Sequence, residues 1–366
     1  MPPPLLLLGE AFGSNEARLG FGFVGASGVE LLKMLGEAGV IALTSEDRSY
    51  LSRFWQTSNP ALVDAVWRLH PEVYRTNVFN LHPLGNDIEQ FCGPKVTALP
   101  GYPALTKSKY VHAKFQSEIE RLADELCTIN PNLIVCLGNT PLWALAGTTG
   151  ISKLRGTTRL STHTVTGIKI LPTYHPAAIL RQWENRPISV ADLIKAGREA
   201  AYPEIRRPER EVWIEPTLED LYEFERRFIN DSPLLSCDIE TSGSLITCIG
   251  FAPTPKAILV VPFFDARRKN KSYWPTSRDE RDAWGFVKRV LENQTPKLFQ
   301  NGLYDIAFLL RSAGIAVRGA AEDTMLLHHA LQPESLKGLG FLGSIYSDES
   351  AWKQERRGTK TIKRDE

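Results

Sequence analysis

Two kinds of hydrophobic pattern alternate along the first half of the chain. Residues 5–8 and 133–137 are continuous apolar runs, which are typical of strands buried on both faces. Between such runs, apolar residues recur three and four positions apart, as they do on one face of a helix. We predict strands at residues 5–8, 73–81, 133–137 and 169–173 and helices at residues 28–38 and 115–127. Alternating strands and helices predict a mostly parallel α/β sheet with loops at the carboxyl ends of its strands.

The second half has a different order of elements. Thr217, followed three residues later by Asp220, predicts the start of a helix. Three extended segments follow, and then a helix, a strand and a second helix. We place these elements at residues 234–238, 245–251, 257–263, 279–291, 297–300 and 304–313. The pattern predicts a second α/β domain.

A polar stretch rich in proline and arginine separates the two halves. A chain of 366 residues is longer than one ordinary domain, so this stretch is the best linker candidate. We predict a first domain over residues 1–201, a linker over 202–211, a second domain over 212–352 and a basic tail over 353–366. The tail has no apolar period, and we expect it to be solvated.

Composition and charge narrow the possible functions. The net charge is +1, so any contact with DNA must come from local basic surface or specific sites. The five cysteines include no Cys-x-x-Cys pair, which favours reduced thiols over disulfides or a zinc site. No apolar run approaches membrane-spanning length and the start does not read as a signal peptide, so we expect a cytoplasmic protein without a membrane partner.

The first candidate site combines residues that stand near strand ends. Gly9 and Glu10 follow the first strand, and glycine there lets backbone amides approach a ligand. An enzyme that excises a base must flip it out, stack it on an aromatic ring and read its pairing edge. Phe23 can stack, Asn77 can read the edge, and Glu10 can orient a water. His175 can stabilise the charge on the departing base. Each of these signals alone is weak, because glycine-rich loops and His-Pro turns are common.

Six segments together resemble the uracil-DNA glycosylase superfamily. They are GEAFG, GFGFVG, TNVFNLHPLGND, PNLIVCLGNTPLWALAG, KLRG and LPTYHPAAIL, within residues 5–182. The resemblance is closest to the bacterial and archaeal iron–sulfur branch and implies a three-layer α/β/α fold. It also implies that Glu10 positions the water and Phe23 stacks on the base, while Asn77 reads the base and His175 stabilises the leaving group.

Three features depart from that family pattern. Phe12 stands where the family has proline, no cysteine pair precedes the first strand, and Leu81 replaces a further cysteine. A four-iron cluster needs four thiolates, and Cys92 alone cannot hold one. We therefore expect no iron–sulfur cluster. Such modules also occur as non-catalytic appendages, so excision and silent recognition both stay open.

The second candidate site consists of carboxylates. Asp238 and Glu240 end an apolar strand, where residues two apart point the same way. Asp305, near a helix start, adds a third. Hard divalent cations prefer clustered carboxylates, and two such ions can promote phosphodiester hydrolysis. Asp323, at the start of the next helix, is better interpreted as its N-cap.

The segments DIET and FQNGLYDIAFL resemble the first two motifs of DnaQ-like 3′–5′ exonucleases. Residues 322–327 and 336–342 resemble the stretch that family-A DNA polymerases carry next. The resemblance implies a ribonuclease-H-like fold and Mg²⁺ or Mn²⁺ bound by Asp238, Glu240 and Asp305. The third motif of the family, a tyrosine or histidine four residues before an aspartate, has no counterpart, because Tyr346 precedes Ser350. We expect that motif beyond Glu366, and hence an incomplete domain that is inactive alone.

These resemblances lead to three hypotheses. The first is the N-terminal part of a phage-type family-A DNA polymerase, acting on single-stranded or uracil-containing DNA in a bacterial or phage-infected cytoplasm. The second is a catalytically silent DNA-binding accessory to a separate polymerase chain. The third is a free-standing repair glycosylase with an exonuclease remnant.

Overall fold

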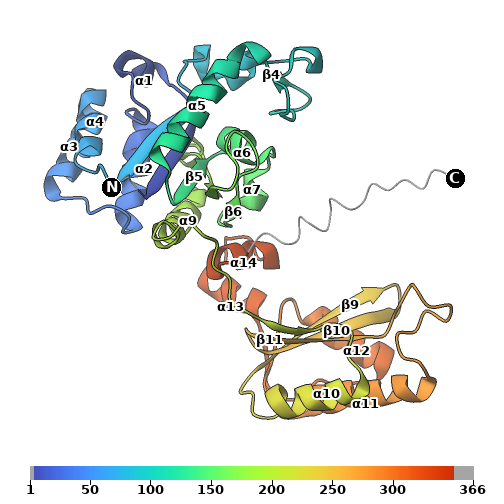
Figure 1. Ribbon diagram of the computed structural model, residues 1–366. Helices are drawn as coiled ribbons and strands as arrows, with labels where there is room; N and C mark the ends of the chain where they lie inside the picture. Colours follow the sequence, from blue (N-terminus) through green and yellow to red (C-terminus); the bar gives the residue numbers. More distant parts are fainter. Residues whose placement is uncertain (1–3, 350–366) are drawn as a thin grey trace. The chain divides into compact units, whose positions relative to one another are not determined.

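The computed structural model describes residues 4–349, and the chain divides into two compact units (Figure 1). The first unit contains the described residues up to Arg206 together with residues 343–349, and the second is Arg207–Leu342. The break after Arg206 falls within the predicted linker. Residues 343–349, which the sequence analysis assigned to the second domain, pack with the first unit. The predicted tail at 353–366 lies outside the described residues.

A five-stranded sheet forms the centre of the first unit. Its strand order is β2-β1-β5-β7-β6, and all pairs are parallel except β6 with β7. The strands are β1 (Leu5–Ala11), β2 (Val73–Phe79), β5 (Leu133–Leu137), β6 (Arg159–Leu160) and β7 (Lys169–Thr173). All four predicted strands are present. The parallel order brings the carboxyl ends of β1, β2, β5 and β7 to one edge of the sheet.

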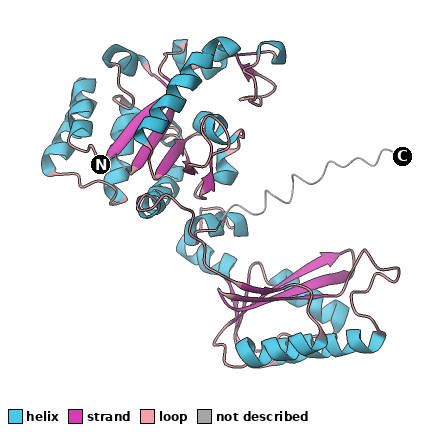
Figure 2. Ribbon diagram, in the orientation of Figure 1, coloured by secondary structure: helices cyan, strands magenta, loops and turns pink. Residues whose placement is uncertain are grey.

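Helices cover both faces of this sheet (Figure 2). Leu5 and Leu7 of β1 belong to one apolar core, whereas Leu6 and Leu8 belong to the other, as the alternation of side chains along a strand requires. The first core includes residues of α2 (Ala26–Glu37), α3 (Ser45–Thr57), α4 (Pro60–Arg68), α8 (Pro176–Ile179) and α9 (Arg186–Glu199). The second includes residues of α5 (Gln116–Ile129), α6 (Asn139–Ala146) and α7 (Ile151–Leu154). The unit is therefore a three-layer α/β/α sandwich.

Shorter elements complete the first unit. Helix α1 (Ser14–Leu19) follows β1 and buries none of its residues. Strands β3 (Cys92–Gly93) and β4 (Tyr110–Val111) form a separate antiparallel pair. Helix α1 therefore adds no side chain to either apolar core, whereas Phe23 and Val24 in the glycine-rich segment after it are buried.

The second unit contains a six-stranded sheet of order β13-β12-β9-β10-β11-β8. Its strands are β8 (Glu211–Trp213), β9 (Leu235–Ser242), β10 (Leu245–Thr254), β11 (Ala257–Pro262), β12 (Lys297–Phe299) and β13 (Ala321–Asp323). Its helices are α10 (Leu218–Phe224), α11 (Ser277–Glu292), α12 (Leu303–Ala313) and α13 (Thr324–Leu331), with α14 (Leu339–Tyr346) following. The predicted order of three strands, helix, strand and helix is present, and Thr217 and Asp220 form the predicted capping box.

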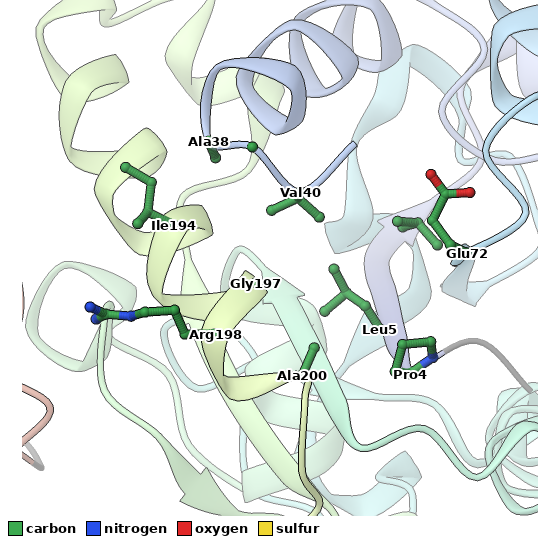
Figure 3. A pocket seen from close by; sticks show the side chains of 11 residues that line it. Pro4, Leu5, Ala38, Val40, Glu72, Ile194, Gly197, Arg198 and Ala200 are labelled. Carbon is green, nitrogen blue, oxygen red and sulfur yellow. The ribbon is translucent and has the colours of Figure 1, made fainter. Parts of the chain in front are cut away.

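A pocket of about 340 Å³ opens where β1 and β2 begin (Figure 3). Leu5 and Val40 line it, together with Glu72 and Arg198. Arg198 donates to the carboxylate of Asp348 at 3.2 Å. The pocket lies at the amino ends of the strands, and none of the predicted site residues lines it.

Two buried lysines bind the carbonyl groups that a helix leaves unpaired at its C-terminus. The Nζ of Lys169 donates to the carboxylate of Glu199 at 2.8 Å and to the carbonyl oxygens of Glu199, Tyr202 and Glu204. The Nζ of Lys297 donates to the backbone and side-chain oxygens of Asn293 in the second unit. Lys169 thereby ties the end of α9 and the chain after it to strand β7.

We expect Lys169→Met to destabilise the first unit by about 3–5 kcal/mol, because it leaves Glu199 buried without its cation. Chemical denaturation followed by circular dichroism measures the free energy of unfolding. Lys107→Met, which replaces an exposed lysine, is the matched control and should change it by less than about 0.5 kcal/mol. Equal stability of the two variants would contradict the anchoring role of Lys169.

Candidate active sites

The first site is built around Gly9, whose backbone is approached by two neighbouring side chains. It stands opposite Asn77 in the parallel pairing of β1 with β2. A Cβ added to Gly9 would lie 2.1 Å from Oδ1 of Asn77 and 2.5 Å from Cζ of Phe23. Only glycine therefore lets the amide and the aromatic ring meet at this strand end.

Asn77 presents a buried hydrogen-bond donor without an acceptor. The residue is 2% exposed, and its Nδ2 has no partner within residues 4–349. Arg121 donates to the backbone carbonyl oxygens of Asn77 and Val78, which fixes the strand at this point. A buried N–H group without a partner costs free energy, so a ligand that offers an acceptor oxygen would be favoured here.

Phe23 adopts a backbone conformation that favours glycine, with φ +59°. Three contacts hold it there. Glu16 accepts a hydrogen bond from its amide at 2.8 Å, and the indole of Trp67 donates to its carbonyl oxygen at 2.9 Å. Gly28 lies so close that an added Cβ would be 1.7 Å from that oxygen. Glu16 was not among the predicted site residues, although its three-residue spacing from Gly13 is a capping-box signal.

His175 is a neutral imidazole at physiological pH. It caps α8 by accepting a hydrogen bond at Nδ1 from the amide of Ala177 at 3.1 Å, so its proton lies on Nε2. Burial, together with the nearby Arg181, lowers the pKa of His175 to about 4. The centroids of the His175 and Phe23 rings are 6.2 Å apart. His175 can therefore donate from Nε2 without carrying a charge.

Glu10 lies half-buried beside this group. Its carboxylate accepts a hydrogen bond from the hydroxyl of Thr140 at 2.5 Å. Burial raises the pKa of Glu10, and the Thr140 hydroxyl and the charge of Arg181 oppose that rise. The charge of Arg181, an exposed residue, acts on both Glu10 and His175. Neither Thr140 nor Arg181 was predicted, although Thr140 follows the glycine turn after β5 and Arg181 stands just beyond α8.

The second unit brings its three predicted carboxylates to one part of β9. Asp238 and Glu240 are exposed and alternate with buried residues, as predicted for one face of a strand. Asp305 of α12 is 5% exposed, and its Oδ1 accepts a hydrogen bond at 3.1 Å from the amide of Ile239, which lies between the other two. Burial raises the pKa of Asp305, and the negative charges of Asp323 and Glu240 raise it further. The hydrogen bond from the Ile239 amide acts in the opposite direction and lowers this pKa.

These oxygen donors match the ligands that Mg²⁺ and Mn²⁺ prefer. Asp305 nevertheless faces the strand backbone. Within the described part of the chain, no three or more histidine, cysteine, aspartate or glutamate side chains are grouped closely enough to hold a metal ion. The donor chemistry therefore fits a divalent cation, while the three-ligand geometry is not formed in advance. The absence of an iron–sulfur cluster stays a prediction.

Asp323 holds the turn from which α12 starts. Its carboxylate accepts from the amides of Asn301 at 3.1 Å, Gly302 at 2.8 Å and Met325 at 2.8 Å, and it caps α13. The N-cap interpretation is therefore confirmed. Burial alone would raise the pKa of Asp323, but these hydrogen bonds together hold it below the ordinary value of 3.8. Asp323 thereby positions the helix that carries Asp305.

Family comparisons agree with this division of the chain. The model of the uracil DNA glycosylase superfamily matches residues 2–196, which is more than half of the chain. The chain belongs to the uracil DNA glycosylase superfamily. A 3′-5′ exonuclease model matches residues 217–363. No curated protein sequence matches.

Several solved exonuclease structures are also similar to this superfamily member. The EXD2 exonuclease domain soaked in Mg and dGMP is 16% identical, with 37% of this chain and 68% of that chain covered and a TM-score of 0.26. Trypanosoma brucei RNase D in complex with RNA U12 is 16% identical, with 34% and 40% covered and a TM-score of 0.26. The Aedes aegypti Nibbler EXO domain is 16% identical, with 36% and 61% covered and a TM-score of 0.27.

The predicted fold class is confirmed: a glycosylase-like α/β/α domain precedes a ribonuclease-H-like exonuclease domain. A superfamily member with this second domain is a DNA-processing protein. In the part of the chain that the structure describes, no helix is long and apolar enough to span a membrane.

We expect Asp323→Asn to lower the stability of the second unit by about 1 kcal/mol at neutral pH, because the neutral amide has no negative charge and only one acceptor oxygen for the amides of Asn301, Gly302 and Met325. A carboxylate whose folded pKa is depressed stabilises the fold above its unfolded pKa, and this contribution is lost as the pH falls through the folded value. Urea denaturation should therefore show the full difference from the wild type above about pH 4 and a shrinking difference below it. The exposed Asp282→Asn is the control, and a pH-independent difference would contradict the assignment.

Proposed function

We propose that the first domain recognises uracil in DNA and excises it by hydrolysis. The buried Nδ2 of Asn77, which has no partner within the described residues, carries this proposal. A flipped uracil offers carbonyl oxygens at its edge, and one of them can accept from that nitrogen. The Phe23 ring lies beside the same amide and supplies a stacking surface, while Gly9 leaves room for both.

The other residues of the site suit the bond change. Water adds its oxygen to the sugar carbon, and its proton passes to the Glu10 carboxylate, whose raised pKa favours this transfer. The N-glycosidic bond breaks, and uracil leaves with the electron pair. The neutral His175 then donates from Nε2 to the negative oxygen of the departing base, and Arg181 adds positive charge nearby.

The hydrogen bond from the Ile239 amide to Asp305, next to the exposed Asp238 and Glu240, favours a second activity, 3′–5′ hydrolysis of DNA. Asp238, Glu240 and Asp305 would hold Mg²⁺ or Mn²⁺, which activates water and stabilises the leaving oxygen. In the printed sequence no tyrosine or histidine stands four residues before an aspartate. We therefore propose that this domain binds a divalent cation but hydrolyses DNA poorly without an added group that orients the water.

The order of the two domains supports a role beside a DNA polymerase. We propose that the chain acts in the cytoplasm as the N-terminal part of a phage-type polymerase and checks template bases with its first domain. The alternative is a catalytically silent accessory that binds DNA for a separate polymerase chain. Release of free uracil from a single-stranded oligonucleotide supports the first proposal, and binding without release supports the alternative.

We expect Asn77→Ala to weaken binding of a uracil-containing single strand by about 1–3 kcal/mol, because the edge-reading hydrogen bond is lost. Fluorescence anisotropy at one fixed salt concentration measures affinity for matched uracil and thymine oligonucleotides. Asn270→Ala, at an exposed position of the second unit, is the control and should bind as the wild type does. Equal affinity of the wild type for uracil and thymine strands would rule out recognition.

For the exonuclease domain we expect calorimetry to show Mn²⁺ binding that Asp238→Ala abolishes, since that change removes one of three carboxylate ligands. Release of 3′ nucleotides from labelled single-stranded DNA should be barely detectable in the wild type with Mn²⁺. Adding a polymerase segment that bears Tyr-x-x-x-Asp should raise it. Rapid release by the wild type alone, lost in Asp238→Ala, would show that the site is already complete.

A further inference from the structure

Residues 343–348 dock on a surface of the first unit that Lys195, Arg155 and Gly156 form. The Nζ of Lys195 donates to the carbonyl oxygens of Ser344 at 2.9 Å and Ser347 at 2.6 Å. Arg155 donates to the hydroxyl of Ser344 at 2.9 Å. A Cβ added to Gly156 would lie 2.9 Å from the carbonyl oxygen of Ser344, so glycine is needed for this approach.

The chemistry of this contact is that of a capped helix end. Helix α14 ends at Tyr346, and the carbonyl groups of a last turn have no partner within the helix. Lys195 supplies the cation that such carbonyls attract. Lys195 is 3% exposed, and apart from these two carbonyls its Nζ donates at 2.8 Å to the carbonyl of Gly156. A buried ammonium needs several acceptors, and two of the three come from the docked segment.

The docked segment is connected to the glycosylase site through buried polar groups. Arg155 also donates from Nε to the Asp192 carboxylate at 2.8 Å, and the Thr173 hydroxyl donates to the same oxygen at 2.6 Å. Thr173 ends β7, two residues before His175. Arg155, Asp192 and Thr173 are each at most 2% exposed. Arg155, Asp192 and the end of β7 therefore form one continuous, closely packed contact in the interior.

We propose that residues 343–348 act as a clasp, and that their docking on Lys195 and Arg155 positions His175 and so regulates the glycosylase site. This regulation rests on the proposed uracil recognition. When the clasp is docked, Arg155 holds Asp192 against Thr173, and His175 stays beside Phe23. When the clasp is released, Lys195 and Arg155 lose the acceptors that Ser344 and Ser347 supply, and the end of β7 is free to shift.

The test compares full-length Lys195→Met with Lys153→Met, which replaces an exposed lysine of α7. Hydrogen exchange followed by mass spectrometry reports docking of residues 343–348, and NMR of the His175 ring reports its surroundings. We expect exchange of the segment to rise about tenfold or more in Lys195→Met only, because two charge-assisted hydrogen bonds are lost. We expect the His175 signals to shift in the same variant, and the preference for uracil over thymine DNA to fall.

Ser344→Ala is a second, milder variant for the case that Lys195→Met does not fold. It removes only the hydroxyl that Arg155 binds and should give smaller changes in the same direction. Unchanged exchange in both variants would overturn the clasp. Faster exchange with unchanged His175 signals would overturn its link to the glycosylase site. If the His175 signals shift while the wild type does not distinguish uracil from thymine, the clasp stands and the proposed uracil recognition fails.

Discussion

The parallel register of β1 with β2 sets the geometry on which the first site depends. Pairing of Leu8 with Thr76 places Gly9 opposite Asn77, so a backbone without a side chain meets a buried amide. Leu5–Leu8 fill both cores with the same side chain, so the leucine run does not by itself distinguish one register from the next. A slip of one residue would place Leu8 or Glu10 opposite Asn77, where a Cβ would clash with the amide and with the Phe23 ring. Gly9 therefore selects the register, and the register gives Phe23 a place beside the amide.

Lysine ammonium groups recur at the ends of helices in both units. Lys169 and Lys195 belong to the glycosylase domain, and Lys297 belongs to the exonuclease domain; each binds backbone carbonyl oxygens from a buried position. Burial lowers the pKa of Lys195 and of Lys297, and the carboxylates of Asp348 and Asp192 oppose the change at Lys195. Each contact stabilises the fold and also favours one position of the helix end, because any other position would leave a buried cation without acceptors.

Short-range patterns could be read from the sequence, whereas contacts between distant residues could not. The strands at 133–137 and 169–173 have the predicted bounds because apolar runs stop at clear turn residues. The cap at Asp323 was predictable for the same reason. The hydrogen bond from Trp67 to Phe23 joins residues 44 positions apart, and the hydrogen bond from Lys195 to Ser344 joins residues 149 positions apart. No local sequence signal marks either pair. The predicted second domain thus included residues that pack on the first unit.

The discontinuous first unit has a consequence for synthesis on the ribosome. Lys195 is translated 149 residues before Ser344, and the exonuclease domain lies between them. At ordinary elongation rates this interval lasts roughly 7–30 s, which is long enough for a small domain to fold. During that time the glycosylase sheet is complete, but the ammonium of Lys195 has only water and Gly156 as acceptors. The first domain is therefore translated first, but its contacts with residues 343–348 can form only after the exonuclease domain has been translated.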